Sequence, residues 1–300
     1  MKHYDERTLA GLIPYPKPGM NKYTRGKLTL IVGSHTYPGA AGLASLASQR
    51  AGAGYTEVYV EDGIVPLLQM YHTSLVVHPW SGWHSSQLKA STESHPCAYV
   101  IGSGFDAQDP YVSGLTRHLL HDAQAPVLVD GGALRLLSAK KIHDLCEQRF
   151  RMGFPTIVTP HGGEAKEMGR IFALTTQDQG DFALQLSQAY GAITVLKGPD
   201  TYISDGVDVH CMSEGTAALA KAGTGDVLAG TIGAFLAQGM GPIDACVLGT
   251  TVHARAGRLA EKDLTSVSVC AEDVITYLPK AIMSIADSAK HKHDDDEEPC

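Results

Sequence analysis

Residues 220–230, AKAGTGDVLAG, combine a run of small residues with one carboxylate. Gly223, Thr224 and Gly225 would let successive backbone N–H groups converge at the start of the helix that follows, where the helix dipole also favours an anion. Asp226 comes next, in the first helical turn, and there it would either cap the helix or accept a proton from a substrate hydroxyl beside a phosphate. The segment therefore predicts a phosphate-binding helix start, and a glycine turn with a capping Asp is the simpler alternative.

A second candidate for phosphate binding is Lys197-Gly198-Pro199-Asp200-Thr201. The pentapeptide follows a short apolar run, so we expect it at the end of a β-strand, where open α/β sheets commonly bind ligands. Its lysine offers a positive charge and its threonine a hydroxyl group. A simple turn is the alternative, because glycine occurs in turns of every kind.

A histidine and two carboxylates follow other expected strands. In TPHGGE, residues 159–164, His161 would orient or protonate a ligand, and Glu164 would cap a helix or hold a metal ion through water. A loop histidine that only makes local hydrogen bonds is the alternative. Asp130 ends another strand, where a carboxylate suits Mg²⁺ or a sugar hydroxyl and equally suits capping of the next helix.

Two glycine-containing segments also occupy expected strand-to-helix connections, GSHTYPGA at 33–40 and GSGFD at 102–106. Neither matches the glycine fingerprint of dinucleotide-binding folds or the Walker phosphate loop. Their small residues would allow the backbone to approach a ligand closely, and tight turns are the alternative.

These segments connect short β-branched runs that alternate with helical stretches, the pattern of a largely parallel sheet in an α/β protein. We expect strands at 28–32, 55–60, 98–101, 126–130, 156–159 and 193–196. Helices are expected at 40–51, 225–238 and 243–259, and a hairpin at 201–204 and 207–212 turns at Asp205 and Gly206. Without a central linker or a repeat, one domain over 1–288 is favoured, followed by a disordered acidic tail at 289–300.

Composition excludes several classes of function. The 300 residues carry 24 Lys and Arg against 32 Asp and Glu, a net charge of −8, which argues against binding to nucleic acid or to a membrane surface. The six cysteines form no CxxC pair, and no apolar stretch approaches the roughly 18 residues of a membrane span. We expect a reduced, cytoplasmic protein without a signal peptide.

Taken in order, these segments resemble the ribokinase-like superfamily and, within it, the NAD(P)H-hydrate dehydratases, the kinase-like half of the YjeF proteins. The resemblance covers about residues 24–285 and is carried by IVGSHTYPGAAGLA, VIGSGFD, PVLVDGGAL, TPHGGEAKEM, VLKGPDT and GTAALAKAGTGDVLAGTIGAFLAQG. It implies a three-layer α/β/α sandwich with a largely parallel central sheet. It also implies a repair reaction on the S epimer of hydrated NADH or NADPH, in which ADP or ATP phosphorylates the hydroxyl with Mg²⁺ and phosphate then leaves.

The resemblance also assigns roles to residues of this chain. Asp226 corresponds to the catalytic base, and the anion hole corresponds to Gly223, Thr224 and Gly225. The positions that match the nucleotide contacts are Lys197, Gly198, Pro199, Asp200, Thr201 and Gly225. The positions that match the lining of the hydrated dinucleotide are Ala40, Gly104, His161 and Asp226.

This chain departs from the family pattern in the motif that begins at Asp130. The family often has Asp-Ala-Asp-Ala-Leu where this chain has Asp130-Gly131-Gly132-Ala133-Leu134, so the second carboxylate is missing. The epimerase half of the fused relatives is also missing, so a separate epimerase or spontaneous epimerisation would supply the second epimer. Relatives imply a homotetramer.

Two other functions remain as alternatives. A small-molecule kinase of the same fold, of the hydroxymethylpyrimidine or hydroxyethylthiazole type, would share the glycine motif and Asp226 but would not require TPH-x-GE. A catalytically silent nucleotide-binding sensor is the other alternative. Asp226 argues against the sensor, because a carboxylate beside phosphates repels them and a pure binder does not need it.

Overall fold

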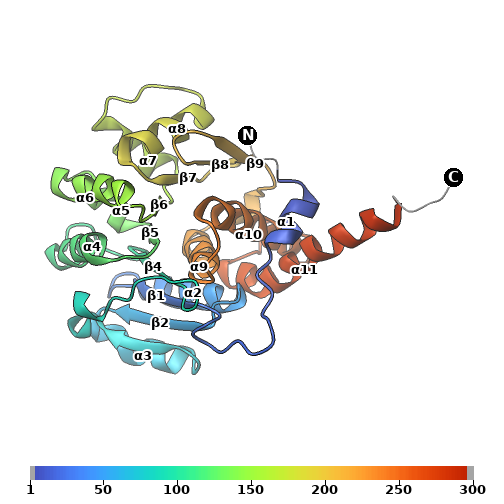
Figure 1. Ribbon diagram of the computed structural model, residues 1–300, viewed down its shortest axis with the longest axis horizontal. Helices are drawn as coiled ribbons and strands as arrows, with labels where there is room; N and C mark the ends of the chain where they lie inside the picture. Colours follow the sequence, from blue (N-terminus) through green and yellow to red (C-terminus); the bar gives the residue numbers. More distant parts are fainter. Residues whose placement is uncertain (1–3, 296–300) are drawn as a thin grey trace.

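The computed structural model describes the backbone of residues 4–295 and the side chains through residue 288. Its strands form one nine-stranded sheet in the order β3-β2-β1-β4-β5-β6-β7-β8-β9 (Figure 1). The strands are β1 (Lys27–Ile31), β2 (Tyr55–Val60), β3 (Val76–Pro79), β4 (Cys97–Ile101), β5 (Val127–Val129), β6 (Thr156–Val158), β7 (Ile193–Leu196), β8 (Thr201–Ser204) and β9 (Val209–Met212). The six strands expected in the parallel part are confirmed, and β3 at the edge is an addition.

Strands β1 to β7 all pair in parallel, whereas β8 pairs antiparallel with β7 and with β9. The sheet is therefore largely parallel, as expected. The expected hairpin is confirmed, but β9 begins at Val209 rather than at residue 207. The Asp205 carboxylate explains the later start, because its Oδ1 accepts the N–H groups of Val207 and Asp208, each at 2.9 Å. These side-chain bonds close the turn before strand pairing begins.

Helices cover both faces of the sheet (Figure 1). One face carries α1 (Glu6–Leu12), α2 (Pro38–Arg50), α9 (Thr224–Ala237), α10 (Pro242–Leu264) and α11 (Ala271–Asp295), and α3 (Val65–Tyr71) lies at the β3 edge. The other face carries α4 (Pro110–Asp122), α5 (Gly132–Leu136), α6 (Lys140–Arg151), α7 (Gly162–Arg170) and α8 (Gln179–Tyr190). The short 3₁₀ helices are η1 (Asp62–Ile64), η2 (Trp80–Gly82), η3 (Ser85–Gln87) and η4 (Ala217–Leu219).

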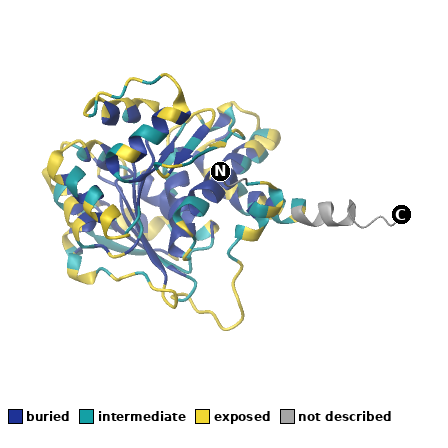
Figure 2. Cartoon of the chain, turned by 45° about the horizontal axis from the view of Figure 1, so that its top comes forward, coloured by how far each residue is buried: buried dark blue, intermediate teal, exposed yellow. Residues whose placement is uncertain are grey.

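Side chains alternate along each strand, so the sheet separates two apolar cores. Leu28 and Leu30 of β1 pack with α2 and α9, whereas Ile31 packs with the helices of the opposite face. All three side chains are fully buried, and Figure 2 shows the strands as the dark centre of the molecule. The expected three-layer α/β/α architecture is therefore confirmed.

The C-terminal helix departs from the sequence prediction. Helix α11 continues through Asp295, so the backbone of 289–295 is helical where the sequence predicted disorder from 289 onward. The buried stripe of Val274, Leu278 and Ile285 fixes the start of this helix on the core. Extension of a formed helix costs little, because each added residue adds one hydrogen bond. Residues 296–300 lie outside the described part of the chain, and the division at residue 288 stays a prediction.

Candidate active site

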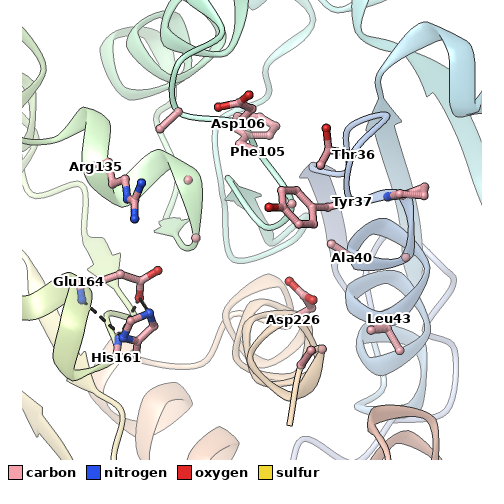
Figure 3. A pocket seen from close by; sticks show the side chains of 18 residues that line it. Thr36, Tyr37, Ala40, Leu43, Phe105, Asp106, Arg135, His161, Glu164 and Asp226 are labelled. Carbon is pink, nitrogen blue, oxygen red and sulfur yellow. Dashed lines mark hydrogen bonds and ion pairs between the residues drawn. The ribbon is translucent and has the colours of Figure 1, made fainter.

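A cavity of about 850 Å³ opens at the C-terminal ends of β1, β4, β5 and β6, beside the start of α9. The chain leaves β1 toward β2 and returns through β4 on the other side of β1, and such a reversal point is where open parallel sheets bind ligands. Ala40, Gly104, His161 and Asp226 all line this cavity, and they come from four different segments of the chain. Figure 3 shows Ala40, His161 and Asp226 around it. The structure therefore brings together the residues predicted to bind a dinucleotide.

Gly104 and Ala40 meet at the cavity wall, in the two glycine-containing segments. Gly104 has a φ of +74°, and a Cβ placed on it would lie 2.7 Å from the Cβ of Ala40 and 2.9 Å from the carbonyl oxygen of Tyr37. Only glycine fits this contact without a shift of the backbone. Both segments are thus tight turns and cavity walls at once, and the two alternatives of the sequence analysis coincide.

The glycine motif forms the N-terminus of α9, as the sequence predicts. Gly223 is the N-cap residue with a φ of +92°, and no side chain caps the helix. Within the described residues, the N–H groups of Gly223, Gly225 and Asp226 have no protein acceptor, whereas the N–H of Thr224 lies 3.5 Å from the carbonyl oxygen of Lys221. Unpaired N–H groups at a helix start attract an anion. Asp226 does not cap the helix, so that alternative is wrong.

Asp130 lies behind this helix start as a buried, fully hydrogen-bonded carboxylate. It is 3% exposed, and it accepts hydrogen bonds from the hydroxyls of Ser103 at 2.9 Å and Thr159 at 2.7 Å. The ammonium group of Lys197 lies 3.1 Å from its Oδ1. Burial opposes ionisation, but Lys197 and the two hydroxyls lower the pKa of Asp130 below its ordinary value. Gly131 is the N-cap residue of α5 and no side chain caps this helix, so Asp130 does not cap it.

Lys197 turns inward from the end of β7, so its ammonium group serves Asp130 as well as the helix start. Its Nζ lies 3.4 Å from the position that a Cβ on Gly225 would take. Burial lowers the pKa of Lys197, but the carboxylates around it, Asp130 first, outweigh burial and raise the pKa. Lys197 therefore stays charged beside the predicted anion site.

No residue of the predicted nucleotide segment, Lys197 included, lines the cavity. Gly198, Pro199 and Asp200 are exposed in the connection between β7 and β8, whereas Thr201 is 6% exposed and pairs with Met212 in the sheet. The structure thus brings Lys197 to Gly225 but leaves the nucleotide contacts of the other four residues as predictions.

Asp226 faces the cavity next to this ion pair. Burial and the negative charge of Asp130 raise the pKa of Asp226 to about 7, although the ammonium group of Lys197 opposes the rise. One lysine thus neutralises Asp130 and leaves Asp226 incompletely compensated. A carboxylate with a pKa near neutrality is suited to accept a proton from a substrate.

His161 and Glu164 form a capping box at the start of α7. Nδ1 of His161 accepts the N–H groups of Gly163 at 3.0 Å and Glu164 at 3.4 Å, and Glu164 Oε2 accepts the N–H of His161 at 2.9 Å. Because Nδ1 is an acceptor, a neutral His161 carries its proton on Nε2, which lies 3.6 Å from Oε2 of Glu164 on a 61% exposed side chain. The local alternative is correct for Nδ1, and Nε2 can still donate to a ligand.

Two residues near the site have no signal in the sequence. The Nε2 atom of His253, on α10, lies 2.9 Å from the carbonyl oxygen of Thr224, and burial lowers the pKa of His253 to about 4. The neutral imidazole therefore donates to the first turn of α9 and holds it in place. Arg135, on α5, lines the cavity and forms an ion pair with Glu167 at 3.4 Å. Both contacts join segments far apart in the sequence.

Among residues 4–288, no group of three His, Cys, Asp or Glu side chains could form a metal site. Mg²⁺ in phosphoryl-transfer sites needs no such group, because substrate phosphates and waters supply most of its ligands around one or two carboxylates. Glu164, with its side chain 14% exposed at the cavity, fits this sparse arrangement. No helix in the described part of the chain is long and apolar enough to span a membrane.

Comparisons with known proteins agree with this site. The Carb_kinase family, described as NAD(P)H-hydrate dehydratase, matches residues 28–280. An ADP-dependent (S)-NAD(P)H-hydrate dehydratase from Xanthomonas campestris is 28% identical over 278 residues, which cover 89% of this chain and 91% of that protein. The bifunctional NAD(P)H-hydrate repair enzyme Nnr of Escherichia coli is 31% identical over 271 residues, which cover 89% of this chain and 49% of that protein.

Solved structures give the same result for the fold. An ADP/ATP-dependent NAD(P)H-hydrate dehydratase from Bacillus subtilis, co-crystallised with ATP and Mg²⁺, matches with a TM-score of 0.77 at 26% identity over 94% of this chain and 97% of that one. A hydroxyethylthiazole kinase from Pyrococcus horikoshii shares the fold at a TM-score of 0.58 and 13% identity, over 92% of each chain. The chain spans about half the length of the bifunctional repair enzymes it matches. On the extent of the family match, this chain belongs to the NAD(P)H-hydrate dehydratase family.

Proposed function

We propose that this chain dehydrates the S epimer of hydrated NADH or NADPH, with ADP or ATP as the phosphoryl donor. The observation that carries the proposal is Asp226, a carboxylate with a pKa of about 7 that faces a large cavity beside unpaired N–H groups. The family match and the dehydratase relatives support the identity of the substrate. The proposed products are NADH or NADPH, phosphate, and AMP or ADP.

Asp226 acts first, as the general base. Its ionised carboxylate takes the proton from the hydroxyl of the hydrated nicotinamide ring as that oxygen attacks the terminal phosphorus of the nucleotide. The bond between this phosphorus and the bridging oxygen of the nucleotide breaks, and AMP or ADP leaves. Burial and the negative charge of Asp130 raise the pKa of Asp226 to about 7, so this carboxylate is basic enough to accept the proton near neutral pH.

The start of α9 stabilises the phosphoryl group in transit. The N–H groups of Gly223 and Gly225, together with the helix dipole, would bind the equatorial oxygens as charge develops on them. The Lys197 ammonium group lies against Gly225 and adds a positive charge there. When bound, Mg²⁺ supplies further charge neutralisation at the donor phosphates, and we propose Glu164 as its contact through water.

The second step removes the phosphate that the first step added. The carbon–oxygen bond breaks, phosphate leaves with the bonding electrons, and loss of a proton from the adjacent ring carbon restores the double bond. The anion site at α9 again suits the leaving phosphate. Nε2 of His161 is accessible at the cavity, and we propose that it donates a hydrogen bond to the dinucleotide.

We further propose a cytoplasmic homotetramer that works with a separate NAD(P)H-hydrate epimerase. The support for the epimerase link is that several relatives are bifunctional repair enzymes about twice as long as the matched region. We propose either ADP or ATP as the donor, because one relative is ADP-dependent and a structurally similar protein is ADP/ATP-dependent.

The test is direct. The protein is mixed with hydrated NADH or NADPH, Mg²⁺ and either ADP or ATP, and the return of the reduced-nicotinamide absorbance is followed. Recovery with at least one nucleotide, with phosphate released in equal amount, is the expected result. A folded protein that binds nucleotide but produces no absorbance would overturn the proposal, and a stable phosphorylated product would point instead to a small-molecule kinase.

A further inference from the structure

Arg135 supplies a positive charge to a cavity that is otherwise acidic. Among the described residues that line the cavity, it is the only lysine or arginine, whereas Asp106, Glu164 and Asp226 contribute three carboxylates. Its side chain extends from α5, across the cavity from Asp226 (Figure 3). An anionic ligand close to these carboxylates would be repelled by them, so the positive charge of Arg135 has a strong influence on where the ligand's own charge lies. Lys197, the other cation nearby, lies behind the start of α9 in its ion pair with Asp130.

Among the described residues, the one carboxylate that pairs with Arg135 leaves most of the guanidinium group available. Its Nε lies 3.4 Å from Oε2 of Glu167 on α7, and the two side chains are 62% and 48% exposed. An exposed pair of this kind contributes little to stability. Within residues 4–288, the terminal N–H groups of Arg135 have no hydrogen-bond acceptor, so they are free to bind a ligand from the cavity side.

Arg151 shows how an arginine without such a role is placed. It lies near the end of α6, it is 74% exposed, and its guanidinium contacts Glu147 one turn earlier at 3.1 Å. Like Arg135 it pairs with one carboxylate among the described residues, but it does not line the cavity. The two arginines are therefore alike in their ion pairs and differ in whether their side chains line the cavity.

We infer that Arg135 binds a phosphoryl group of the hydrated dinucleotide, an inference that rests on the proposed function. The planar guanidinium matches a phosphate with two parallel N–H donors, which a lysine cannot reproduce. A hydrated dinucleotide carries two such sources, the pyrophosphate in both forms and the 2′-phosphate in the NADPH form only. Arg135 is thus a dinucleotide-binding residue, and it favours hydrated NADPH over hydrated NADH if the phosphate that it binds is the 2′-phosphate.

The test compares Arg135→Gln with Arg151→Gln, which removes the same charge from a matched exposed arginine. KM and kcat are measured with hydrated NADH and with hydrated NADPH. We expect Arg135→Gln to raise KM about tenfold with kcat little changed, because charged hydrogen bonds to phosphate are lost. An equal rise for both substrates assigns the pyrophosphate, and a rise for hydrated NADPH alone assigns the 2′-phosphate. No rise for either substrate overturns the inference.

A second variant separates ligand binding from a structural role of the ion pair. Glu167→Gln removes the carboxylate partner and leaves Arg135 in place. If Arg135 binds phosphate, this variant keeps or lowers KM, because the guanidinium loses a competitor. If the pair only joined α5 to α7, Glu167→Gln would raise KM as much as Arg135→Gln does, and that result overturns the inference.

Direct binding distinguishes failure of the inference from failure of the proposed function. The dissociation constant of hydrated NADPH is measured by equilibrium dialysis without nucleotide, for the unmodified protein and for Arg135→Gln. Binding that weakens about tenfold in the variant, in a protein that shows no dehydration, supports the phosphate contact and overturns the activity. Dehydration with the same dissociation constant in both proteins supports the activity and overturns the phosphate contact.

Discussion

Two clusters of charged side chains in this protein have the same kinds of members but different balances. On the side of α10 that faces α1, Arg255 contacts Glu214 through Nε and Nη2, each at 2.8 Å, and it also binds Glu6 at 3.0 Å through Nη1. At the cavity, Lys197 binds Asp130 at 3.1 Å and faces Asp226 without a direct bond. Each cluster sets one cation among two carboxylates.

The Arg255 cluster is balanced by its geometry. The guanidinium presents its donors to both carboxylates at once, and the hydrogen bonds that it donates to Glu214 and Glu6 raise the pKa of Arg255 above its ordinary value despite partial burial. The Lys197 ammonium group satisfies Asp130 alone, and the pKa of Asp226 rises to about 7. In the Arg255 cluster both carboxylates are paired, and the network joins α1 to α10. In the Lys197 cluster one carboxylate, Asp226, is left without a direct ion pair, and it can accept a proton near neutral pH.

We expect the largest effect on activity from a substitution of Asp226, the carboxylate without a direct ion pair. Asp226→Asn keeps the shape of the side chain but removes the base, so kcat should fall about a thousandfold, within the usual range for a general base. Nucleotide binding should remain, because the N–H groups at the start of α9 are unchanged. Turnover and nucleotide dissociation constants measure the two effects. Turnover at the original rate would contradict the role of Asp226.

The same variant changes stability in the opposite direction. The pKa of Asp226 is higher in the folded protein than the ordinary 3.8, so the unfolded chain releases this proton first as pH rises. Folding therefore loses stability between about pH 4 and pH 7 in the unmodified protein, and Asp226→Asn removes that loss. Thermal unfolding at pH 5 and pH 8 measures it. A Tm difference between the two proteins that is the same at both pH values would show that the folded protein does not raise the pKa of Asp226.

Removal of the lysine makes the cavity cluster more unbalanced. Lys197→Met leaves Asp130 buried without its cation, which should lower the free energy of unfolding by about 3 kcal/mol. It should also weaken nucleotide affinity more than it slows chemistry, because a positive charge beside Gly225 is lost. Chemical denaturation and nucleotide titration measure these effects. An unchanged nucleotide dissociation constant would contradict the placement of Lys197 at the anion site.

The smallest effect on activity is expected at the balanced cluster. Arg255→Met removes the charge and leaves two carboxylates facing each other, so the free energy of unfolding should fall by about 2 kcal/mol. The side chains of Glu6 and Glu214 are 29% and 32% exposed, which limits the loss through solvation. The value of kcat should not change at a temperature where the variant is folded. A variant that loses turnover but not stability would show that the two clusters do not differ as described.

The sequence predicted the elements better than it predicted the interactions between them. Alternating β-branched runs and the small-residue helix after Pro38 were sufficient for the parallel sheet and for α2 and α9. Strand β3 was missed because its residues, Val76-Val77-His78-Pro79, include a histidine and a proline that are unusual in strands. Helix α11 beyond 288 was missed because charged runs usually predict a solvated tail.

The site was predictable where one short segment carries the chemistry. The glycine motif and TPHGGE each combine small and charged residues within a few positions, so Asp226 and His161 could be found from sequence alone. The pairing of Lys197 with Asp130 could not, because 67 residues separate them and only the fold brings them together. The contact of His253 with the Thr224 carbonyl was hidden in the same way.

The pH dependence of kcat/KM tests the central claim most directly, because it reports the ionisation of the free protein. With a pKa of about 7 for Asp226, kcat/KM should rise tenfold per unit below pH 7 and level off above it. The measurement follows the return of reduced-nicotinamide absorbance from pH 5 to pH 9 at fixed ionic strength. A rate that is already level at pH 5 would show that the essential carboxylate ionises near its ordinary value, and the account of an unmatched Asp226 would then be wrong.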